Sequence, residues 1–201
     1  MFSATDLSCS RGGRCLFEGI SFELQGGAWL RIQGANGSGK TTLIRTLVGL
    51  SPADCGRVSW RGADIREQAH DYRRAMAYVG HPSALKDDLT PTENLRLALA
   101  LDGFEVDAST ALSALQRVGL ADNEYPPTRY LSAGQKRRVL LARLLLRDAS
   151  LWVLDEPFSA LDTAAIEQFG GLLQEHLDGG RVAVITSHQP VPLPAGQELT
   201  L

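Results

Sequence analysis

The sequence predicts an α/β fold with a parallel-sheet core, and three observations support this prediction. Residues 34–42 match a glycine-rich phosphate-binding loop, which is found between a strand and a helix. Residues 151–154 form a continuous apolar run, which is typical of a strand buried on both faces. Strand-like segments at 151–154 and 181–186 flank a helical pattern at 163–177, and such alternation indicates parallel strands.

The first third of the chain is predicted to contain an antiparallel β region. Gly26-Gly27 and Arg61-Gly62 each lie between two strand-like segments, and each pair predicts a hairpin-type turn. The expected strands are 17–24, 28–32, 57–60, 63–65 and 78–80. A helix of about 40–49 is expected directly after the phosphate loop.

The middle third is predicted to be helical. Segments 92–100 and 108–118 have apolar residues at helical spacing, and the first of them begins after a proline. A further helix is expected to begin at Ser132 and to continue to Arg147. We expect a single domain over 1–201, in which about 82–146 form a helical subdomain.

Composition narrows the function classes. The chain has 201 residues, 44% of them hydrophobic, and a net charge of −3, so no global basic field exists to gather nucleic acid. The sequence shows no signal peptide and no apolar run long enough to cross a bilayer. Cys9, Cys15 and Cys55 form no metal-binding or redox pair, which favours reduced thiols in the cytoplasm. His70 and His176 are predicted to be surface residues.

The phosphate loop predicts a bound nucleoside triphosphate. Its glycines allow backbone N–H groups to point at phosphate oxygens, while Lys40 supplies a charge for the β- and γ-phosphates. The Thr41 hydroxyl is expected to hold Mg²⁺. The predicted phosphate-binding residues are Gly34, Ala35, Asn36, Gly37, Ser38, Gly39, Lys40, Thr41 and Thr42.

Two carboxylates follow the strand at 151–154. Asp155 stands where a phosphoryl-transfer site needs a second metal-holding oxygen, and Glu156 is expected to polarise the attacking water. The alternative is an ordinary strand-to-loop junction, which a preceding phosphate loop makes a weaker interpretation.

Residues 131–135, Leu-Ser-Ala-Gly-Gln, resemble the signature of ABC-type ATPases. The resemblance extends from Leu7 to Thr200 and includes a D-loop at 159–162 and a switch histidine at His188. It implies an ABC-type cassette that hydrolyses ATP with Mg²⁺, and a homodimer that closes over two ATP molecules. Ser132, Gly134 and Gln135 are then expected to contact the partner's nucleotide, and Ser132 is expected to cap its helix.

Two departures from the family pattern are informative. His81 stands where these cassettes carry a glutamine that reaches the metal and the water; imidazole offers one hydrogen bond with a shorter reach, and a loop residue without a role is the alternative. No aromatic residue stands near Arg11 to stack on adenine. Arg11 or Arg14 could stack a guanidinium plane there, or adenine could be held loosely. The alternative for both arginines is simple solvent exposure.

Four segments, at 80–81, 131–135, 151–158 and 187–190, also resemble the ATP-binding subunits of cytochrome c maturation haem-export systems. This resemblance implies a peripheral ATPase on the cytoplasmic face of a bacterial inner membrane, bound to integral membrane permease subunits. It also implies that those partners, rather than this chain, handle haem. Three alternatives stay open: an exporter of another substrate, a soluble ABC ATPase in DNA repair or translation, and a nucleotide sensor without turnover.

Overall fold

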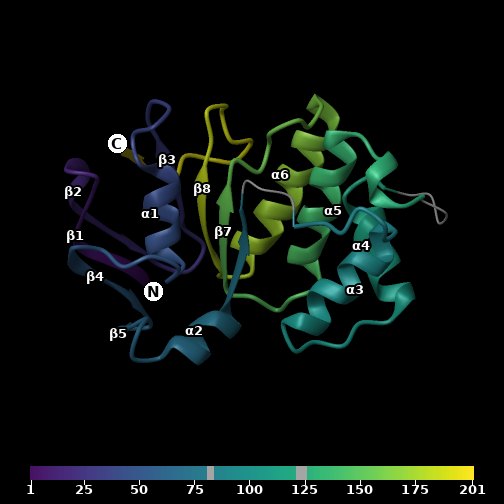
Figure 1. The fold of residues 1–201 in the computed structure, drawn as a ribbon, viewed down its shortest axis with the longest axis horizontal. Helices are drawn as coiled ribbons and strands as arrows, with labels where there is room; N and C mark the ends of the chain where they lie inside the picture. The colour runs from purple at the N-terminus through teal and green to yellow at the C-terminus, as the bar shows by residue number, and fades with distance from the viewer. Residues whose placement is uncertain (81–83, 121–125) are drawn as a thin grey trace. The chain divides into compact units, whose positions relative to one another are not determined.

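The computed structural model describes residues 1–80, 84–120 and 126–201, and its chain forms two compact units (Figure 1). Unit 1 comprises Met1–Tyr78, Ala149–Glu156 and Leu173–Leu201. Unit 2 comprises Val79–Asp148 and Pro157–Leu172. The chain therefore crosses between the units four times.

Unit 1 contains the parallel sheet that the sequence predicts. Its strand order is β6-β7-β8-β3-β9, and β3 is hydrogen-bonded in parallel to both β8 and β9, as is β7 to β8. Every residue of β7 and β8 is buried, which confirms the interpretation of these segments as central strands. The strands are β3 (Trp29–Gln33), β6 (Met76–Val79), β7 (Leu151–Asp155), β8 (Val182–Thr186) and β9 (Gln197–Thr200).

A second, antiparallel sheet completes the strands of unit 1. Its order is β2-β1-β4-β5, so β1 lies between β2 and β4 although the sequence analysis did not identify it. The turn at Arg61-Gly62 joins β4 to β5 as predicted. The strands are β1 (Phe2–Arg11), β2 (Arg14–Leu24), β4 (Cys55–Trp60) and β5 (Ala63–Asp64).

The predicted hairpin at Gly26-Gly27 is wrong. The strands on either side of it, β2 and β3, belong to different sheets. The glycine is explained instead by packing, because a Cβ at Gly26 would lie 2.7 Å from the carbonyl oxygen of Gly180. A two-glycine signal thus marks a close backbone approach here rather than a tight turn between paired strands.

The core of unit 1 lies around helix α1 (Lys40–Leu47), between the two sheets (Figure 1). Leu43, Ile44 and Leu47 are fully buried and join one hydrophobic cluster with residues of both sheets. This packing fixes the first turn of α1, and hence the phosphate loop, to the rest of unit 1. A shorter helix, α2 (Ala69–Ala75), precedes β6.

Unit 2 is helical. Helices α3 (Pro91–Leu101), α4 (Ala108–Arg117) and α5 (Ala133–Leu145) pack on one another, with a 3₁₀ turn at Thr128–Tyr130. Thr90 and Glu93 form a capping box at the start of α3. Helix α6 (Thr163–Asp178) begins in unit 2 and ends in unit 1. No helix in the described part of the chain is long and apolar enough to cross a membrane.

Candidate functional site

The phosphate loop joins β3 to α1 in unit 1. Gly34, Gly37 and Gly39 have φ angles of 150°, 77° and 105°, in the left-handed region that glycine tolerates best. A Cβ at Gly34 would lie 2.7 Å from both the Leu201 carbonyl oxygen and Ser38 Oγ. Only glycine therefore fits the start of this loop.

Lys40 folds back over the phosphate loop. Its Nζ donates to the carbonyl oxygens of Gly34 and Ala35, at 2.8 and 3.0 Å, and the residue is 9% exposed. The neighbouring Asn36, Gly37 and Thr41 are exposed, so one side of the loop is open to a ligand. Thr42 and Ser38 are half-buried. The hydroxyl oxygen of Ser38 is itself buried and has no hydrogen-bond partner among the described atoms. A cation within an open ring of backbone amides is suited to a phosphate chain.

Thr41 and Asp155 form the pair expected to hold a metal. Thr41 Oγ1 lies 3.3 Å from Asp155 Oδ2, while Asp155 Oδ1 accepts from Thr186 Oγ1 at 2.7 Å. No group of three or more histidine, cysteine or acidic side chains that could hold a metal occurs among the residues described. A hydroxyl and one carboxylate suit Mg²⁺, which keeps water and substrate phosphates as its other ligands.

Glu156 is held at the end of β7 by Thr186. Its backbone N–H donates to Thr186 Oγ1 at 2.9 Å and to the Thr186 carbonyl oxygen at 3.2 Å. The φ of Glu156 is 51°, a conformation that an L-residue keeps only where its surroundings enforce it. One threonine hydroxyl therefore contacts both the Asp155 carboxylate and the Glu156 backbone. From the sequence, Thr186 is predicted only as the last residue of a strand.

His188 lies beside Glu156. Its Nε2 is 3.4 Å from Glu156 Oε1, and the two side chains are 52% and 19% exposed. Gln189, the next residue, accepts from Ser187 Oγ at 2.8 Å and from Arg31 Nη2 at 3.1 Å. The loop that carries His188 is thus tied to β3, the strand that leads into the phosphate loop.

The signature residues begin α5 in unit 2. Ser132 Oγ accepts from the backbone N–H of Gln135 at 3.2 Å, and Gln135 Oε1 accepts from the N–H of Ser132 at 2.9 Å. This capping box confirms the expected capping role of Ser132. A Cβ at Gly134 would lie 2.7 Å from the carbonyl oxygen of Ala160, so the D-loop packs directly on this turn.

A polar cavity of about 580 Å³ opens beside the signature turn. Its wall includes Arg138, whose Nη2 donates to both carboxylate oxygens of Asp162 at 3.0 and 2.9 Å. Arg138 Nη1 also donates to the carbonyl oxygen of Gly119 at 3.2 Å. The cavity is lined by Gly119, Leu120, Ser132, Ala133, Gly134, Gln135, Arg138, Ala160 and Asp162. Arg138 is a site residue that no motif in the sequence singles out.

The structure sorts the predicted site residues into two groups. The phosphate loop, Asp155, Glu156 and His188 lie together in unit 1, and the signature residues lie in unit 2. His81 lies outside the described residues.

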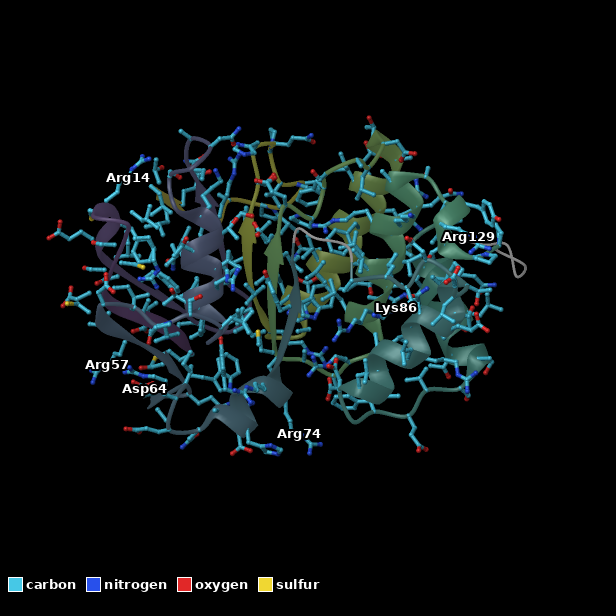
Figure 2. All side chains as sticks on the ribbon, in the orientation of Figure 1. Arg14, Arg57, Asp64, Arg74, Lys86 and Arg129 are labelled. Atoms are coloured by element: carbon cyan, nitrogen blue, oxygen red, sulfur yellow. The ribbon has the colours of Figure 1, made fainter. Side chains whose placement is uncertain are left out.

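The two arginines considered for adenine differ. Arg11 is occupied, because Nη1 lies 3.5 Å from Asp54 Oδ1 and Nη2 donates to the Pro52 carbonyl oxygen at 3.1 Å. Arg14 is exposed and extends into solvent at the edge of unit 1 (Figure 2).

The surface prediction for His176 is wrong. The residue is 4% exposed and its ring stacks on Trp152, with centroids 3.9 Å apart. Burial lowers the pKa of His176 to about 4, and its Nε2 bonds to the carbonyl oxygen of Val182 at 3.1 Å. His176 lies on the buried face of α6. Histidine occurs on both the buried and the exposed faces of helices, so helical periodicity alone does not predict which face this residue occupies. His70 is exposed as predicted.

The chain resembles known proteins over nearly its full length. Residues 17–159 match the family model described as ABC transporter. The cytochrome c biogenesis ATP-binding export protein CcmA of Dechloromonas aromatica (strain RCB) is 48% identical over 196 residues, 98% of this chain and 96% of that protein. The protein of the same name from Pseudomonas aeruginosa is 44% identical over 201 residues, 100% of this chain and 99% of its own.

Solved structures show the same fold. A putative ABC transporter ATP-binding protein from Pyrococcus furiosus has a TM-score of 0.86 at 24% identity, covering 100% of this chain and 96% of its own. A structure described as the ATP binding subunit of an ABC transporter has a TM-score of 0.81 at 28% identity, covering 94% of this chain and 79% of its own.

Proposed function

The chain belongs to the ABC transporter family, and from that membership we propose that it is the ATP-hydrolysing subunit of a membrane transporter for cytochrome c biogenesis. The observation that carries the proposal is the 44–48% identity to CcmA proteins across practically the whole chain. The transporter's task is haem export or delivery, and its membrane subunits handle the haem. The reaction of this chain is ATP + water → ADP + phosphate.

In unit 1, the phosphate loop binds the triphosphate and Lys40 moves its ammonium from the loop carbonyls to the β- and γ-phosphates. Thr41 and Asp155 would hold Mg²⁺, which neutralises charge on those phosphates when bound. The two residues lie 3.3 Å apart through Thr41 Oγ1 and Asp155 Oδ2, so they can share one ligand sphere. Thr186 keeps the Asp155 carboxylate turned toward Thr41.

Glu156 and His188 act on water and the γ-phosphate. The Glu156 carboxylate accepts a hydrogen bond from the attacking water and takes its proton as the new P–O bond forms, while the bond from the γ-phosphorus to the bridging oxygen breaks and that oxygen leaves with ADP. His188, 3.4 Å from Glu156, donates Nε2–H to the γ-phosphate and stabilises its growing charge. Glu156 has a left-handed backbone with a φ of 51°, and it directly follows β7.

The remaining contacts come from a second copy of the chain. Ser132, Gly134 and Gln135 stand at the N-terminus of α5, where amide groups attract an anion, beside a polar cavity. In a head-to-tail homodimer these residues complete the nucleotide site of the partner. Arg14 is the arginine left to lie over adenine, because Arg11 is bound to Asp54 and Pro52.

The proposed location is the cytoplasmic face of a bacterial inner membrane, where the chain binds integral permease subunits without nucleic acid. Deletion of the gene is expected to remove mature c-type cytochromes, measured by haem staining of membrane proteins. The parent gene should restore them, and Lys40→Ala should not, because it removes the charge that counters the phosphates. Normal cytochromes in the deletion strain would contradict the haem assignment. Stimulation of the ATPase by DNA or ribosomes would instead favour a soluble role.

A further inference from the structure

Arg137 occupies an unusual place in unit 2. It lies on α5, is 7% exposed, and uses two nitrogen atoms to contact two separate segments of the chain. Its Nε donates to the carbonyl oxygen of Pro157 at 3.1 Å, and its Nη1 donates to the carbonyl oxygen of Gly80 at 3.1 Å. A planar guanidinium fixes the angle between its donors, so the two carbonyls are held relative to one another.

The two carbonyls mark the places where the chain enters unit 2. Tyr78 and Glu156 are the last residues of unit 1 at two of the four crossings. Gly80 follows the first crossing by two residues, and Pro157 follows the second directly. One buried side chain thus joins both entering segments to α5, inside unit 2.

Both segments bear on the proposed hydrolysis site. Gly80 is the last described residue before His81, and Pro157 follows Glu156, whose amide is held by Thr186 at 2.9 Å. A left-handed φ of 51° at Glu156 persists where the surrounding structure enforces it. Thr186 fixes the side toward β7, and Arg137 fixes the side toward unit 2.

Helix α5 is a rigid support for this contact. Val139 and Leu141 are buried, and the capping box of Ser132 holds the first turn five residues before Arg137. A displacement of the signature turn would therefore carry Arg137, and through it the two carbonyls.

We propose that Arg137 is a positioning residue for ATP hydrolysis, which fixes the backbone at Gly80 and Pro157 to the signature helix so that the Glu156 carboxylate stays aligned. The proposal rests on the proposed function, because it requires that Glu156 serve hydrolysis. Arg137 acts through the backbone, and its loss should lower the turnover number more than nucleotide affinity. Misplacement of a reacting group by about 1 Å can lower a rate about a hundredfold.

The test compares Arg137→Met, which keeps much of the aliphatic stem without donors, with Arg143→Met on the same helix. Arg143 pairs with Asp102 at 2.5 Å, and among the described residues it has no hydrogen bond to either crossing segment. For the purified full-length variants, kcat and KM for Mg-ATP are measured, with ATP affinity determined in a Glu156→Gln background. We expect Arg137→Met to lower kcat about tenfold or more, with affinity within about threefold of the parent. Arg137→Lys, which keeps an ammonium donor, should recover part of kcat.

Three results would overturn the inference. The first is a kcat for Arg137→Met equal to that of Arg143→Met. The second is parallel loss of kcat, ATP affinity and melting temperature without recovery in Arg137→Lys, which indicates a merely structural residue. If Arg137→Met does not fold, the test uses Arg137→Lys and Arg137→Gln in its place. The third result is then a kcat for Arg137→Gln equal to that of the parent. Absence of hydrolysis by the parent overturns the proposed function as well, whereas equal hydrolysis by parent and variant overturns only the role of Arg137.

Discussion

Among the single residues of the site, Glu156 is held by several contacts. Its amide donates twice to Thr186, its φ is positive, and its carboxylate lies 3.4 Å from His188. These contacts orient the side chain without occupying the loop that receives phosphates. Loss of its negative charge should therefore affect the chemical step and leave nucleotide binding intact.

Glu156→Gln is expected to keep ATP affinity within about threefold and to lower kcat at least about a hundredfold, because an amide cannot take the proton of water. Steady-state phosphate release and equilibrium ATP binding measure the two quantities. Glu105→Gln is the control, because it makes the same substitution at an exposed residue outside the site. Hydrolysis by Glu156→Gln at the parental rate would exclude Glu156 as the base.

His176 gives a second prediction at the residue scale. Its folded pKa of about 4 lies below the ordinary value of 6.5, so the unfolded chain binds a proton first as pH falls. The contribution of His176 to stability is complete above about pH 6.5 and is lost as pH drops to about 4. Between about pH 7 and about pH 5 the free energy of unfolding should fall by about 2 kcal/mol from this group.

Urea unfolding monitored by circular dichroism measures that difference. In His176→Phe the ring still packs on Trp152 but does not titrate, so the pH-dependent loss should shrink by about 2 kcal/mol. His70→Gln removes an exposed histidine and should leave the loss unchanged. An equal loss in parent and His176→Phe would contradict the burial argument.

Residue identity and order were enough to predict which side chains gather at the phosphate loop. Lys40, Thr41, Asp155 and Glu156 belong to short motifs, and parallel strands bring such motifs to one edge of a sheet. Thr186 escaped prediction because its role depends on register: it pairs opposite Asp155 across β7 and β8. The pairing register of two strands that lie thirty residues apart cannot be predicted from the local sequence of either strand.

At the scale of elements, the turn that begins α5 is closely packed against the D-loop. The Ala160 backbone leaves no space for a side chain at Gly134, the second residue of α5. The Ser132 and Gln135 capping box satisfies the first N–H groups of α5 at the same turn. The glycine at position 134 is therefore explained by the contact with the D-loop and not by helix propensity.

Gly134→Ala should lower the free energy of unfolding by about 1 to 3 kcal/mol, because its Cβ would lie 2.7 Å from a carbonyl oxygen. Gly171→Ala, in α6, meets no atom within 4 Å and should raise stability by up to about 1 kcal/mol. Denaturant midpoints of the two variants measure the difference. If Gly134→Ala were as stable as the parent or more stable, the D-loop would have moved to accommodate the added methyl group.

Helices were easier to predict than strands. The predicted segment 92–100 corresponds to Pro91–Leu101, and 108–118 to Ala108–Arg117, because both carry caps and helical periodicity. The strand at Phe2–Arg11 was missed, since its alternation is interrupted where register shifts occur against β2. Strand β9, Gln197–Thr200, is mostly exposed and has no apolar run to mark it.

For the whole molecule, the proposed homodimer makes a prediction about association. Each nucleotide would contact the phosphate loop of one chain and the signature turn of the other chain. ATP should then control the association of two chains of 21.7 kDa each.

Glu156→Gln with ATP and Mg²⁺ is expected to elute from a sizing column as a dimer, because bound triphosphate is not turned over. Adding Ser132→Asp should return it to a monomer: aspartate keeps the helix cap but repels the partner's phosphates. Thr90→Asp changes the cap of α3 in the same way and should leave the dimer intact. A stable dimer with Ser132→Asp would exclude the signature turn from the interface.

The placement of aromatic residues has an optical consequence. All three tryptophans of the chain, Trp29, Trp60 and Trp152, belong to unit 1. Excitation at the long-wavelength edge of protein absorbance, where only tryptophan absorbs, therefore gives fluorescence from unit 1 and none from unit 2. Trp152 stacks on an imidazole and Trp60 packs near Tyr72, so emission from this chain reports events around β7 and the antiparallel sheet without any attached dye. A single tryptophan introduced into unit 2 would give the second half a signal of its own.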